Sequence, residues 1–343
     1  MPTCAFVSFR LGMTDGVSVV ARNWQRAFEG FGFDVRTVAG DGPVDRTVPG
    51  LAIGAANPPT RAEVADAVAD AALVVVENLL SIPLNVPAAR VVADVLAGRP
   101  ALLHHHDPPW QRARFAHVTE LPPHDEAWCH VTVNHLTRVE MAERGLDATC
   151  IYNGFPTGTG PGDRSGVRRA LGVADTTLLL AHPVRAIPRK DIGAAVRLAE
   201  RLGGTYWLWG RADDGFDREL ARILDAARCP VIRGTPNRRA VDLYRAADAV
   251  LFPSTWEGFG NPPVEAAIHR VPVAVGPYPV ADELRALGFE WYPTDDPEPL
   301  RRALAAGDPA PLDHNRRIAT TFFSLEAMTD AIAGLLAARG WLP

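Results

Sequence analysis

The chain has 343 residues, of which 47% are hydrophobic and 22% charged, and its formal net charge at neutral pH is −5. This length is long for one domain and sufficient for two, each with its own core. The basic residues are dispersed and no repeat combines aromatic with basic residues, so we expect no nucleic-acid partner.

Strand-like and helix-like segments alternate through the first half of the chain, which favours an α/β protein with parallel sheets. The apolar segment Cys4–Phe9 predicts a strand, and the amphipathic segment Val17–Phe31 predicts the helix that follows it. Further strands and helices are predicted within residues 34–38, 62–76, 86–103, 125–133, 136–144 and 148–152.

A segment rich in glycine and proline, residues 153–166, interrupts this alternation and predicts a linker between two domains. We therefore place one domain at residues 1–155, a second at residues 156–324, and a last helix within residues 325–343. The second domain repeats the alternation, with elements predicted at residues 177–181, 191–202, 205–208, 216–227, 231–232, 239–246 and 249–252.

The chain begins with a strand and has no basic leader followed by a long apolar stretch, so we expect a cytoplasmic protein. Its longest apolar runs, such as residues 71–76, have the length of strands and are too short to cross a bilayer. The four cysteines, at positions 4, 129, 150 and 229, lack Cys-x-x-Cys spacing and predict core thiols rather than disulfides or a zinc site.

Three consecutive histidines, His104, His105 and His106, precede Asp107 and suggest a metal site. Successive side chains on an extended strand point to opposite faces, however, so three in a row cannot all bind one ion. We therefore expect no metal ion at these histidines. No other pattern in the sequence indicates a cofactor, and we expect none.

Two glutamates eight residues apart, Glu257 and Glu265, flank a glycine turn in the second domain. The apolar segment Ala249–Phe252 predicts a buried strand just before them, which places Glu257 at the strand's carboxyl end. Two carboxylates so placed could accept hydrogen bonds from separate hydroxyl groups of one ligand. The alternative is that Glu257 is solvated and Glu265 merely complements a helix dipole.

The turn between these glutamates predicts the start of a helix, with Asn261 as N-cap, Pro262 at the first helical position and Glu265 in the first turn. Gly258 and Gly260 would let the backbone approach a ligand closely. The N-terminus of such a helix favours a phosphate group, because its N–H groups are unpaired and its dipole is positive there.

The chain contains 34 arginines and one lysine, Lys190, which follows Arg185 by five residues. Both lie on a predicted loop between a strand at 177–181 and a helix at 191–202, and parallel sheets bind ligands at such edges. The arginine can grip a diphosphate through its planar fork, and the lysine adds a compact charge. A surface charge pair at a helix start is the alternative.

Arg185, Lys190, the sequence Glu257-Gly-Phe-Gly and Glu265 together resemble the donor site of retaining glycosyltransferases of family 4. The resemblance covers most of the chain. It implies a GT-B fold, with two Rossmann-like domains facing across a cleft and a C-terminal helix that packs toward the first domain. It also implies hexose transfer from a nucleoside diphosphate sugar to an acceptor hydroxyl, with retained anomeric configuration and without a metal.

The same resemblance assigns roles to individual residues. Arg185 and Lys190 would stabilise the departing diphosphate, Glu257 would orient the sugar, and Glu265 would bind the ribose. His106 would hold the sugar near its hydroxymethyl group. The other residues expected to bind the donor are Gly258, Phe259, Gly260, Asn261, Gly16, Asn153 and Gly234.

Acceptor binding is expected in the first domain. Asp15 and Ser18 could contact acceptor hydroxyls, although a helix-capping turn would explain them equally well. Trp110 and Arg112 offer an aromatic surface and a cation suited to a sugar or an acidic acceptor.

Several alternatives remain open. The donor could be of the GDP-mannose or UDP-glucose type, and the acceptor a sugar, an oligosaccharide or a glycoside. The chain could instead be a non-catalytic nucleotide-sugar-binding subunit of a glycan assembly complex, or a sugar-nucleotide epimerase on the same fold. No pattern in the sequence indicates the oligomeric state.

Overall fold

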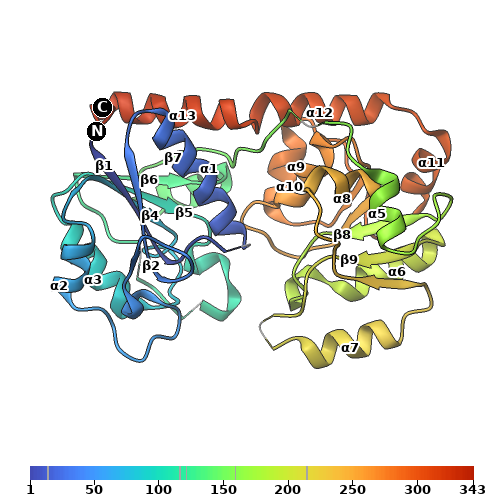
Figure 1. Cartoon of the computed structure of the whole chain (residues 1–343), viewed down its shortest axis with the longest axis horizontal. Coiled ribbons are helices and arrows are strands. Elements are labelled where there is room, and N and C mark those ends of the chain that lie inside the picture. The colour runs from blue at the N-terminus through green and yellow to red at the C-terminus, as the bar shows by residue number, and fades with distance from the viewer. Residues whose placement is uncertain (14, 116, 121, 159, 214) are drawn as a thin grey trace. The chain divides into compact units, whose positions relative to one another are not determined.

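The computed structural model describes residues 1–343 except positions 14, 116, 121, 159 and 214. The chain divides into two compact units, the first formed by Met1–Gly154 with Leu325–Pro343 and the second by Phe155–Ser324 (Figure 1). Each unit contains one parallel sheet flanked by helices. The predicted α/β class with parallel sheets is therefore confirmed.

The first unit contains a seven-stranded parallel sheet with the order β3-β2-β1-β4-β5-β6-β7. Its strands are β1 (Thr3–Arg10), β2 (Asp34–Asp41), β3 (Arg46–Thr47), β4 (Ala71–Glu77), β5 (Ala101–His105), β6 (Trp128–Thr132) and β7 (Ala148–Cys150). Its α-helices are α1 (Gly16–Gly30), α2 (Arg61–Ala67), α3 (Val86–Leu96), α4 (His135–Ala142) and α13 (Leu325–Ala338). Strand order reverses between β1 and β4, and ligands of such sheets bind beyond the carboxyl ends of the strands at that point.

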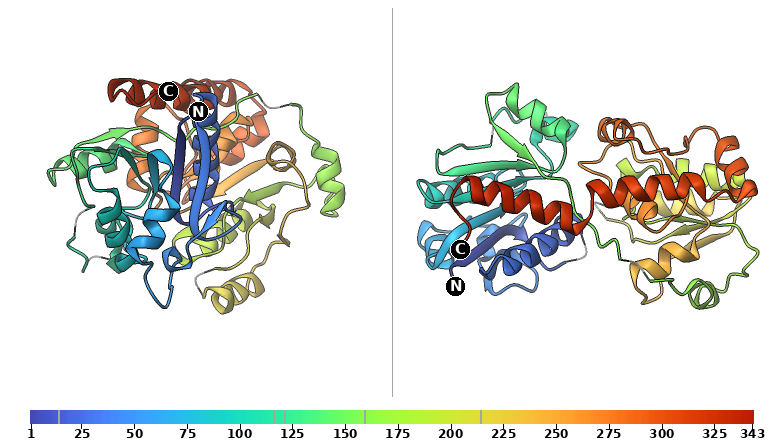
Figure 2. Two further views of the ribbon diagram at one scale, coloured as in Figure 1. Left: turned by 60° about the vertical axis from the view of Figure 1, so that its left-hand side comes forward. Right: turned by 90° about the horizontal axis from the view of Figure 1, so that it is seen from above.

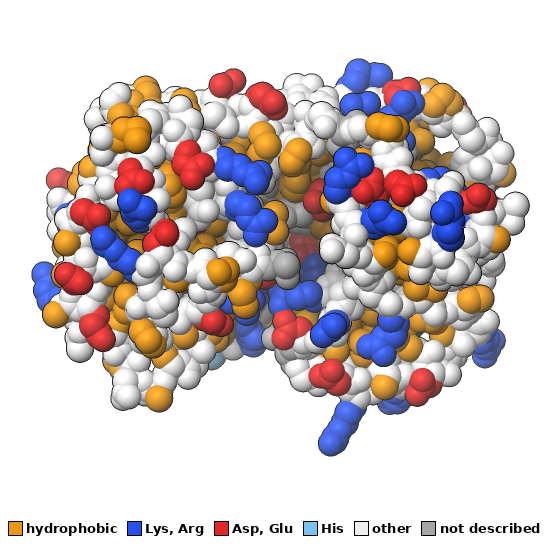
Figure 3. All heavy atoms as spheres, viewed as in Figure 1, with side chains coloured by type: hydrophobic (Ala, Val, Ile, Leu, Met, Phe, Trp, Pro, Cys, Tyr) orange, Lys and Arg blue, Asp and Glu red, His pale blue; other side chains and the backbone are white. Residues whose placement is uncertain are grey.

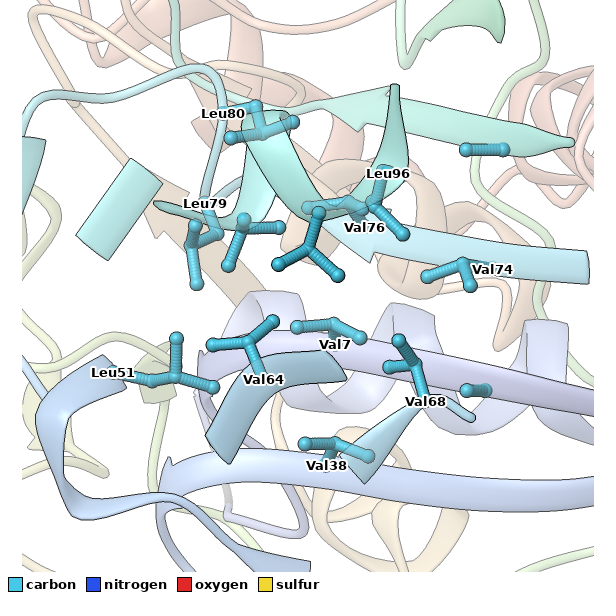
Figure 4. Close-up of a cluster of buried hydrophobic side chains, with 14 of the residues drawn as sticks. Val7, Val38, Leu51, Val64, Val68, Val74, Val76, Leu79, Leu80 and Leu96 are labelled. Atoms are coloured by element: carbon cyan, nitrogen blue, oxygen red, sulfur yellow. The ribbon is translucent and has the colours of Figure 1, made fainter. Parts of the chain in front are cut away.

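Alternation along the strands divides the apolar residues of the first unit between two cores. On one face, Val74 and Val76 of β4 pack with Val7 of β1, Val64 of α2 and Leu96 of α3 (Figure 4). Because side chains point to opposite faces in turn, the intervening residues of the same strands form the second core on the other face.

The helix α13 belongs to the first unit (Figure 2). Met328, Ile332 and Leu336 recur every fourth residue, form one apolar stripe and are buried in the second core with Trp24 and Phe28 of α1. The helix is therefore held to the first unit by burial of this stripe.

The second unit contains a five-stranded parallel sheet with the order β10-β9-β8-β11-β12. Its strands are β8 (Leu179–His182), β9 (Thr205–Leu208), β10 (Val231–Arg233), β11 (Ala249–Phe252) and β12 (Val273–Val275). Its α-helices are α5 (Arg164–Ala170), α6 (Ile192–Leu202), α7 (Asp217–Asp225), α8 (Ala240–Ala246), α9 (Asn261–Ile268), α10 (Pro279–Ala286), α11 (Glu298–Ala306) and α12 (Ala310–Phe322). Strand order reverses here between β8 and β11, which makes their carboxyl ends the expected ligand edge.

Four helices of the second unit were not predicted from the sequence: α5, α10, α11 and α12. Three of them carry proline in the first turn, where its missing N–H costs nothing, whereas prolines in a sequence suggest a break. The helix α5 begins inside the predicted linker, where Asp163 accepts a hydrogen bond from the backbone N–H of Gly166 at 2.9 Å. The linker prediction was wrong for these last residues.

Among the described residues, no helix is both long and apolar enough to cross a membrane. The predicted cytoplasmic location stays a prediction.

On the face shown in Figure 3, acidic and basic side chains are interspersed rather than gathered into an extended region of one sign.

Buried histidines make the folded state sensitive to acid. Burial lowers the pKa of His130 to about 4, of His182 to about 3 and of His269 to about 4, and the charges of Lys190 at His182 and of Arg245 and Arg316 at His269 add to the effect. Below pH 6.5 the unfolded chain binds protons that the folded chain does not, so unfolding becomes easier as the pH falls toward 4.

We expect each of these histidines to lower the free energy of unfolding at pH 5 by about 2 kcal/mol relative to pH 7, measured by urea denaturation. A His130→Gln variant should lose less stability on acidification than the native chain; an identical loss would contradict this origin.

Candidate functional site

The loops that follow β8 and β11 bring Lys190 and Glu257 together. These strands are neighbours at the point where strand order reverses, and the loops are joined by the backbone N–H of Thr255, which donates to the Arg189 carbonyl at 2.9 Å. The carboxylate of Glu257 is buried. Its Oε1 accepts from Lys190 Nζ, and its Oε2 accepts from Arg189 Nη1.

This ion triad, Glu257 with Lys190 and Arg189, is mostly withdrawn from solvent and carries one net positive charge. Burial would raise the pKa of Glu257, but the charges of Lys190 and Arg189 outweigh it and lower that pKa to about 2. Burial lowers the pKa of Lys190 to about 8, although the charge of Glu257 opposes the shift. At neutral pH all three side chains are therefore ionised, and the surplus positive charge favours an anionic ligand.

His182 lies at the end of β8 and remains neutral beside the triad. Its Nδ1 lies 2.8 Å from the hydroxyl of Tyr206, and its ring is completely buried. Burial and the charge of Lys190 together hold its pKa at about 3. This residue therefore adds no charge to the site.

Arg189 was not predicted as a site residue, and its place differs from that of Arg185. The Arg185 guanidinium is exposed and pairs with Asp213. The guanidinium of Arg189 also donates to the Trp256 carbonyl at 2.8 Å, which fixes it against the Glu257 loop. Its position immediately before the single lysine of the chain was the available signal, but the spacing from Arg185 to Lys190 drew attention instead.

Glu265 lies in the second turn of α9, so its predicted place in the first turn was wrong. The hydroxyl of Tyr244 donates to Glu265 Oε2 at 2.9 Å. The Tyr244 ring stacks on His269 and meets Trp209 edge to face, each at 5.0 Å between ring centroids. Burial raises the pKa of Glu265, and the Tyr244 hydrogen bond partly offsets that rise.

The predicted N-cap of α9 was also off by one residue, because Gly260 is the N-cap and Asn261 is the first helical residue. Gly260 has φ = +96°, and a β-carbon there would lie 2.2 Å from the Tyr278 hydroxyl oxygen. The two residues after Asn261, Pro262 and Pro263, have no N–H to offer a ligand. The start of α9 thus depends on the left-handed backbone of Gly260, and it offers fewer N–H groups to a ligand than a usual helix start.

Two further residues that were predicted to bind the sugar donor, Phe259 and Gly234, lie in the second unit. Phe259 is buried and contacts Phe155 and Phe323, with ring centroids 6.2 and 5.6 Å away. Gly234 follows β10 with φ = +81°, and its carbonyl accepts from Trp207 Nε1 at 2.8 Å. Phe259 therefore anchors the loop in the core, while Gly234 lies at the ligand edge of the sheet.

In the first unit, His106 belongs to a buried cluster with His104 and Glu77. Glu77 Oε2 lies 3.0 Å from His104 Nδ1 and 2.9 Å from His106 Nε2. His105 points to the other face of the sheet, where its Nε2 lies 2.9 Å from His130 Nδ1. The argument that three consecutive histidines cannot share one ion is confirmed, but it overlooked Glu77, which gives the cluster a third group able to bind a metal.

Asp15, Gly16 and Ser18 form the capped start of α1. The Asp15 carboxylate accepts from the backbone N–H of Ser18 at 3.2 Å and from its hydroxyl at 2.9 Å. The helix-capping interpretation is confirmed. A contact with the acceptor stays a prediction, as does a donor contact for Gly16.

The first unit also holds three other residues predicted to bind a substrate: Trp110 and Arg112, which have side-chain partners, and Asn153, which is buried. Trp110 Nε1 donates to Glu140 at 2.8 Å, and the Arg112 guanidinium pairs with Asp107. Asn153 is buried close to the end of the first unit's main segment. Their predicted roles in binding stay predictions.

Comparison with known proteins adds a family match in the second unit. Residues 218–306 match the family model described as "Glycosyl transferases group 1". This segment includes Glu257 and Glu265.

Curated relatives match parts of the chain. It is 34% identical over 187 residues to a D-inositol 3-phosphate glycosyltransferase of Mycobacteroides abscessus, which covers 50% of this chain and 40% of that protein. It is 24% identical over 276 residues to a mannosylglucosylglycerate synthase of Petrotoga mobilis, which covers 64% of this chain and 63% of that protein. Each match spans less than two thirds of the relative's length.

Solved structures match almost the whole chain. HepE of Anabaena, crystallised in complex with UDP and glucose, has a TM-score of 0.75 and 19% identity, with 98% of this chain and 100% of that chain covered. A sucrose-phosphate synthase of Thermosynechococcus elongatus has a TM-score of 0.70 and 15% identity, with 98% and 99% covered. The two parallel-sheet units thus form the GT-B fold of glycosyltransferase structures.

The geometry at Gly260 predicts that a side chain is not tolerated there. In Gly260→Ala the new methyl group would collide with the Tyr278 hydroxyl and hold a left-handed backbone, so we expect the free energy of unfolding to fall by at least about 2 kcal/mol in chemical denaturation. Gly234→Ala is the matched control, because it shares the positive φ but has open space around the new methyl group, and should lose only about 1 kcal/mol. Equal losses in the two variants would refute the collision.

Proposed function

We propose that this protein is a retaining glycosyltransferase of family 4 that uses its E-x7-E pair, Glu257 and Glu265. It moves a hexose from a nucleoside diphosphate sugar, of the GDP-mannose or UDP-glucose type, to a hydroxyl of a sugar, oligosaccharide or glycoside. The ion triad at the ligand edge of the second sheet carries this proposal. The family match over residues 218–306 and the names of the relatives support it.

The triad suits a diphosphate because it holds two cations against a single carboxylate. When a doubly charged diphosphate binds, Lys190 stabilises its oxygens and Glu257 remains ionised to accept hydrogen bonds from the hexose hydroxyls. Arg185 turns from Asp213 to the diphosphate. Its present ion pair is exposed and worth at most about 1 kcal/mol, so this exchange costs little.

Glu265 binds the ribose of the donor in this scheme. A carboxylate that accepts from two neighbouring ribose hydroxyls replaces the water it would otherwise bind, and the Tyr244 hydroxyl fixes its orientation. The backbone around Gly258, Gly260 and Asn261 approaches the phosphates closely.

In the chemical step, the bond between the anomeric carbon and the phosphate oxygen breaks as the acceptor oxygen forms its bond on the same face. The acceptor proton passes to the departing phosphate, which leaves as the nucleoside diphosphate. Lys190 and Arg185 stabilise the charge that develops there, and His106 holds the hexose near its hydroxymethyl group. No metal ion takes part in this proposal.

A lost charge-assisted contact should weaken donor use strongly. In Lys190→Ala we expect kcat/KM for the donor to fall at least about tenfold, because such contacts contribute about 1.5–3 kcal/mol. A thermal-shift panel of UDP, GDP, ADP and TDP with their sugar conjugates identifies the donor first, and turnover assays with that donor then measure the effect.

Arg222→Ala is the matched control, because this exposed arginine pairs with Glu219 in the same unit and should leave donor kinetics unchanged. Stabilisation by no nucleotide would refute the proposed function. Tight binding without transfer to any acceptor would favour a binding subunit, and a changed sugar nucleotide without acceptor would favour an epimerase.

The pKa of Lys190 predicts an alkaline limit to donor binding. Because that pKa is lowered to about 8, the cation that meets the diphosphate is lost as the pH rises through this value. We expect the nucleotide affinity of the free protein to decline between pH 7 and 9, as measured by calorimetric titration. Lys190→Arg keeps its charge throughout this range and should abolish the decline. A parallel decline in the variant would assign the effect to another group.

A further inference from the structure

Glu77, at the carboxyl end of β4, is a fully buried carboxylate that binds imidazoles rather than a lysine or an arginine. Among the described residues its side chain has two hydrogen-bond partners, His104 Nδ1 at 3.0 Å and His106 Nε2 at 2.9 Å, and both contact the same oxygen. The other oxygen, Oε1, is buried without a partner in this part of the chain. A buried carboxylate oxygen without a partner is costly for stability, which points to a role in function.

The position of the cluster is set by the sheet. Glu77 is directly opposite His104 in the parallel register of β4 and β5. His106 lies two residues further on and therefore on the same face. The cluster thus lies at the carboxyl end of β4, where strand order reverses and where parallel sheets bind ligands.

Hydrogen-bond chemistry fixes the proton positions on both rings. An ionised carboxylate only accepts hydrogen bonds, so each imidazole must direct an N–H toward Glu77. His104 then carries its proton on Nδ1 and His106 carries its proton on Nε2. In a neutral His106 ring, Nδ1 is consequently left with a lone pair and can only accept.

The backbone of His106 is held as firmly as its ring. The Asn78 side-chain oxygen accepts from the backbone N–H groups of His106 and Asp107, each at 3.1 Å. Asn78 itself has φ = +59°, a left-handed conformation that asparagine tolerates better than most residues. Its side chain thus fixes the backbone that carries His106.

Aromatic rings also pack together within the cluster and against it. The His104 ring lies against Trp24, with ring centroids 4.1 Å apart, and against His106 at 4.4 Å. His104 is fully buried, whereas the side chain of His106 keeps 9% of its exposure. His106 is therefore the member of the cluster that a ligand can reach.

We propose that Glu77 is a positioning residue that holds His106 in the Nε2–H tautomer, so that Nδ1 accepts a hydrogen bond from a ligand hydroxyl. The ligand assignment rests on the proposed function, in which that hydroxyl belongs to the transferred hexose. A site that accepts from a hydroxyl discriminates against the analogue that lacks it, because its own polar atom is then left unpaired. Glu77 would thus contribute to sugar specificity without touching the sugar.

The tautomer can be measured without any substrate. In protein labelled with ¹⁵N-histidine, we expect long-range proton–nitrogen NMR spectra at pH 7.5 to show His106 protonated on Nε2 and unprotonated on Nδ1. Comparison with His106→Gln assigns the signals. Detection of the Nδ1–H tautomer for His106 in the native protein would overturn the proposal, whatever the substrate turns out to be.

Glu77→Gln tests the coupling, because the amide keeps the shape of the side chain but can also donate. We expect the His106 nitrogen signals to shift toward a mixture of tautomers, while His130→Gln, which alters the histidine pair on the opposite face, leaves them unchanged. An unchanged His106 pattern in Glu77→Gln would refute the positioning role.

Turnover gives the functional half of the test. With the donor found by the nucleotide panel, Glu77→Gln should lower kcat/KM at least about tenfold and leave the affinity for the free nucleoside diphosphate unchanged. With a donor that lacks the contacted hydroxyl, the loss of kcat/KM caused by Glu77→Gln should be smaller. An equal loss with both donors would indicate a merely structural defect and overturn the specificity role. If no nucleotide binds even the native protein, the proposed function fails while the NMR result still decides the role of Glu77.

The same histidine spectra test the competing interpretation, in which Glu77, His104 and His106 bind a metal ion. Titration with Zn²⁺ should leave the His104 and His106 signals in place at stoichiometric metal, because the ring nitrogens that face Glu77 carry protons and have no lone pair for an ion bound between the three side chains. Tight binding of one equivalent that shifts both sets of signals would show a metal centre and overturn the proposal.

Discussion

The second unit depends on the ion triad in which Lys190 and Arg189 share the buried carboxylate of Glu257. Three charges have left water together, so removal of the Glu257 carboxylate alone would leave two cations without a counter-charge, and such an uncompensated buried charge typically costs about 3–5 kcal/mol. The triad exists because β8 and β11 are adjacent although a long stretch of chain separates them. The strand order thus places these three side chains together, and their burial limits screening of the ion pairs by water. The result is a positive site whose carboxylate is already oriented before any ligand binds.

The first sheet uses a different chemistry at the equivalent place in its own topology. There the buried carboxylate of Glu77 is matched by the imidazoles of His104 and His106, so the surplus of positive charge seen beside Glu257 is absent from these partners. A site with excess cations favours a diphosphate, whereas a neutral ring nitrogen favours a hydroxyl. Under the proposed function, the second unit would bind the charged part of the donor and the first would contact uncharged groups.

Local patterns in the sequence were sufficient for much of the fold and for part of the site. Apolar runs of four to eight residues identified most strands. The glutamate spacing drew attention to Glu257 and the composition drew attention to Lys190, but their ion pair was not predicted. The late helices α10, α11 and α12 were missed because their prolines resemble breaks but occupy first turns. The start of α9 was misplaced by one residue because Asn261 is a good N-cap in general, whereas here Tyr278 packs where a β-carbon at Gly260 would lie.

Arg189 and Glu77 were missed for a different reason, which is that their meaning comes from neighbours distant in sequence. Arg189 is one arginine among 34 until the β11 loop places a carboxylate beside it. Glu77 ends an apolar strand and resembles a solvated terminus until the register of β4 and β5 sets it opposite His104. Once parallel pairing is assumed, the sequence predicts this cluster. The acid ends one buried strand and the two histidines, two residues apart, end the next, so all three must lie at one edge of the sheet. Polar residues that end adjacent buried strands therefore carry more information together than any one of them carries through its local spacing.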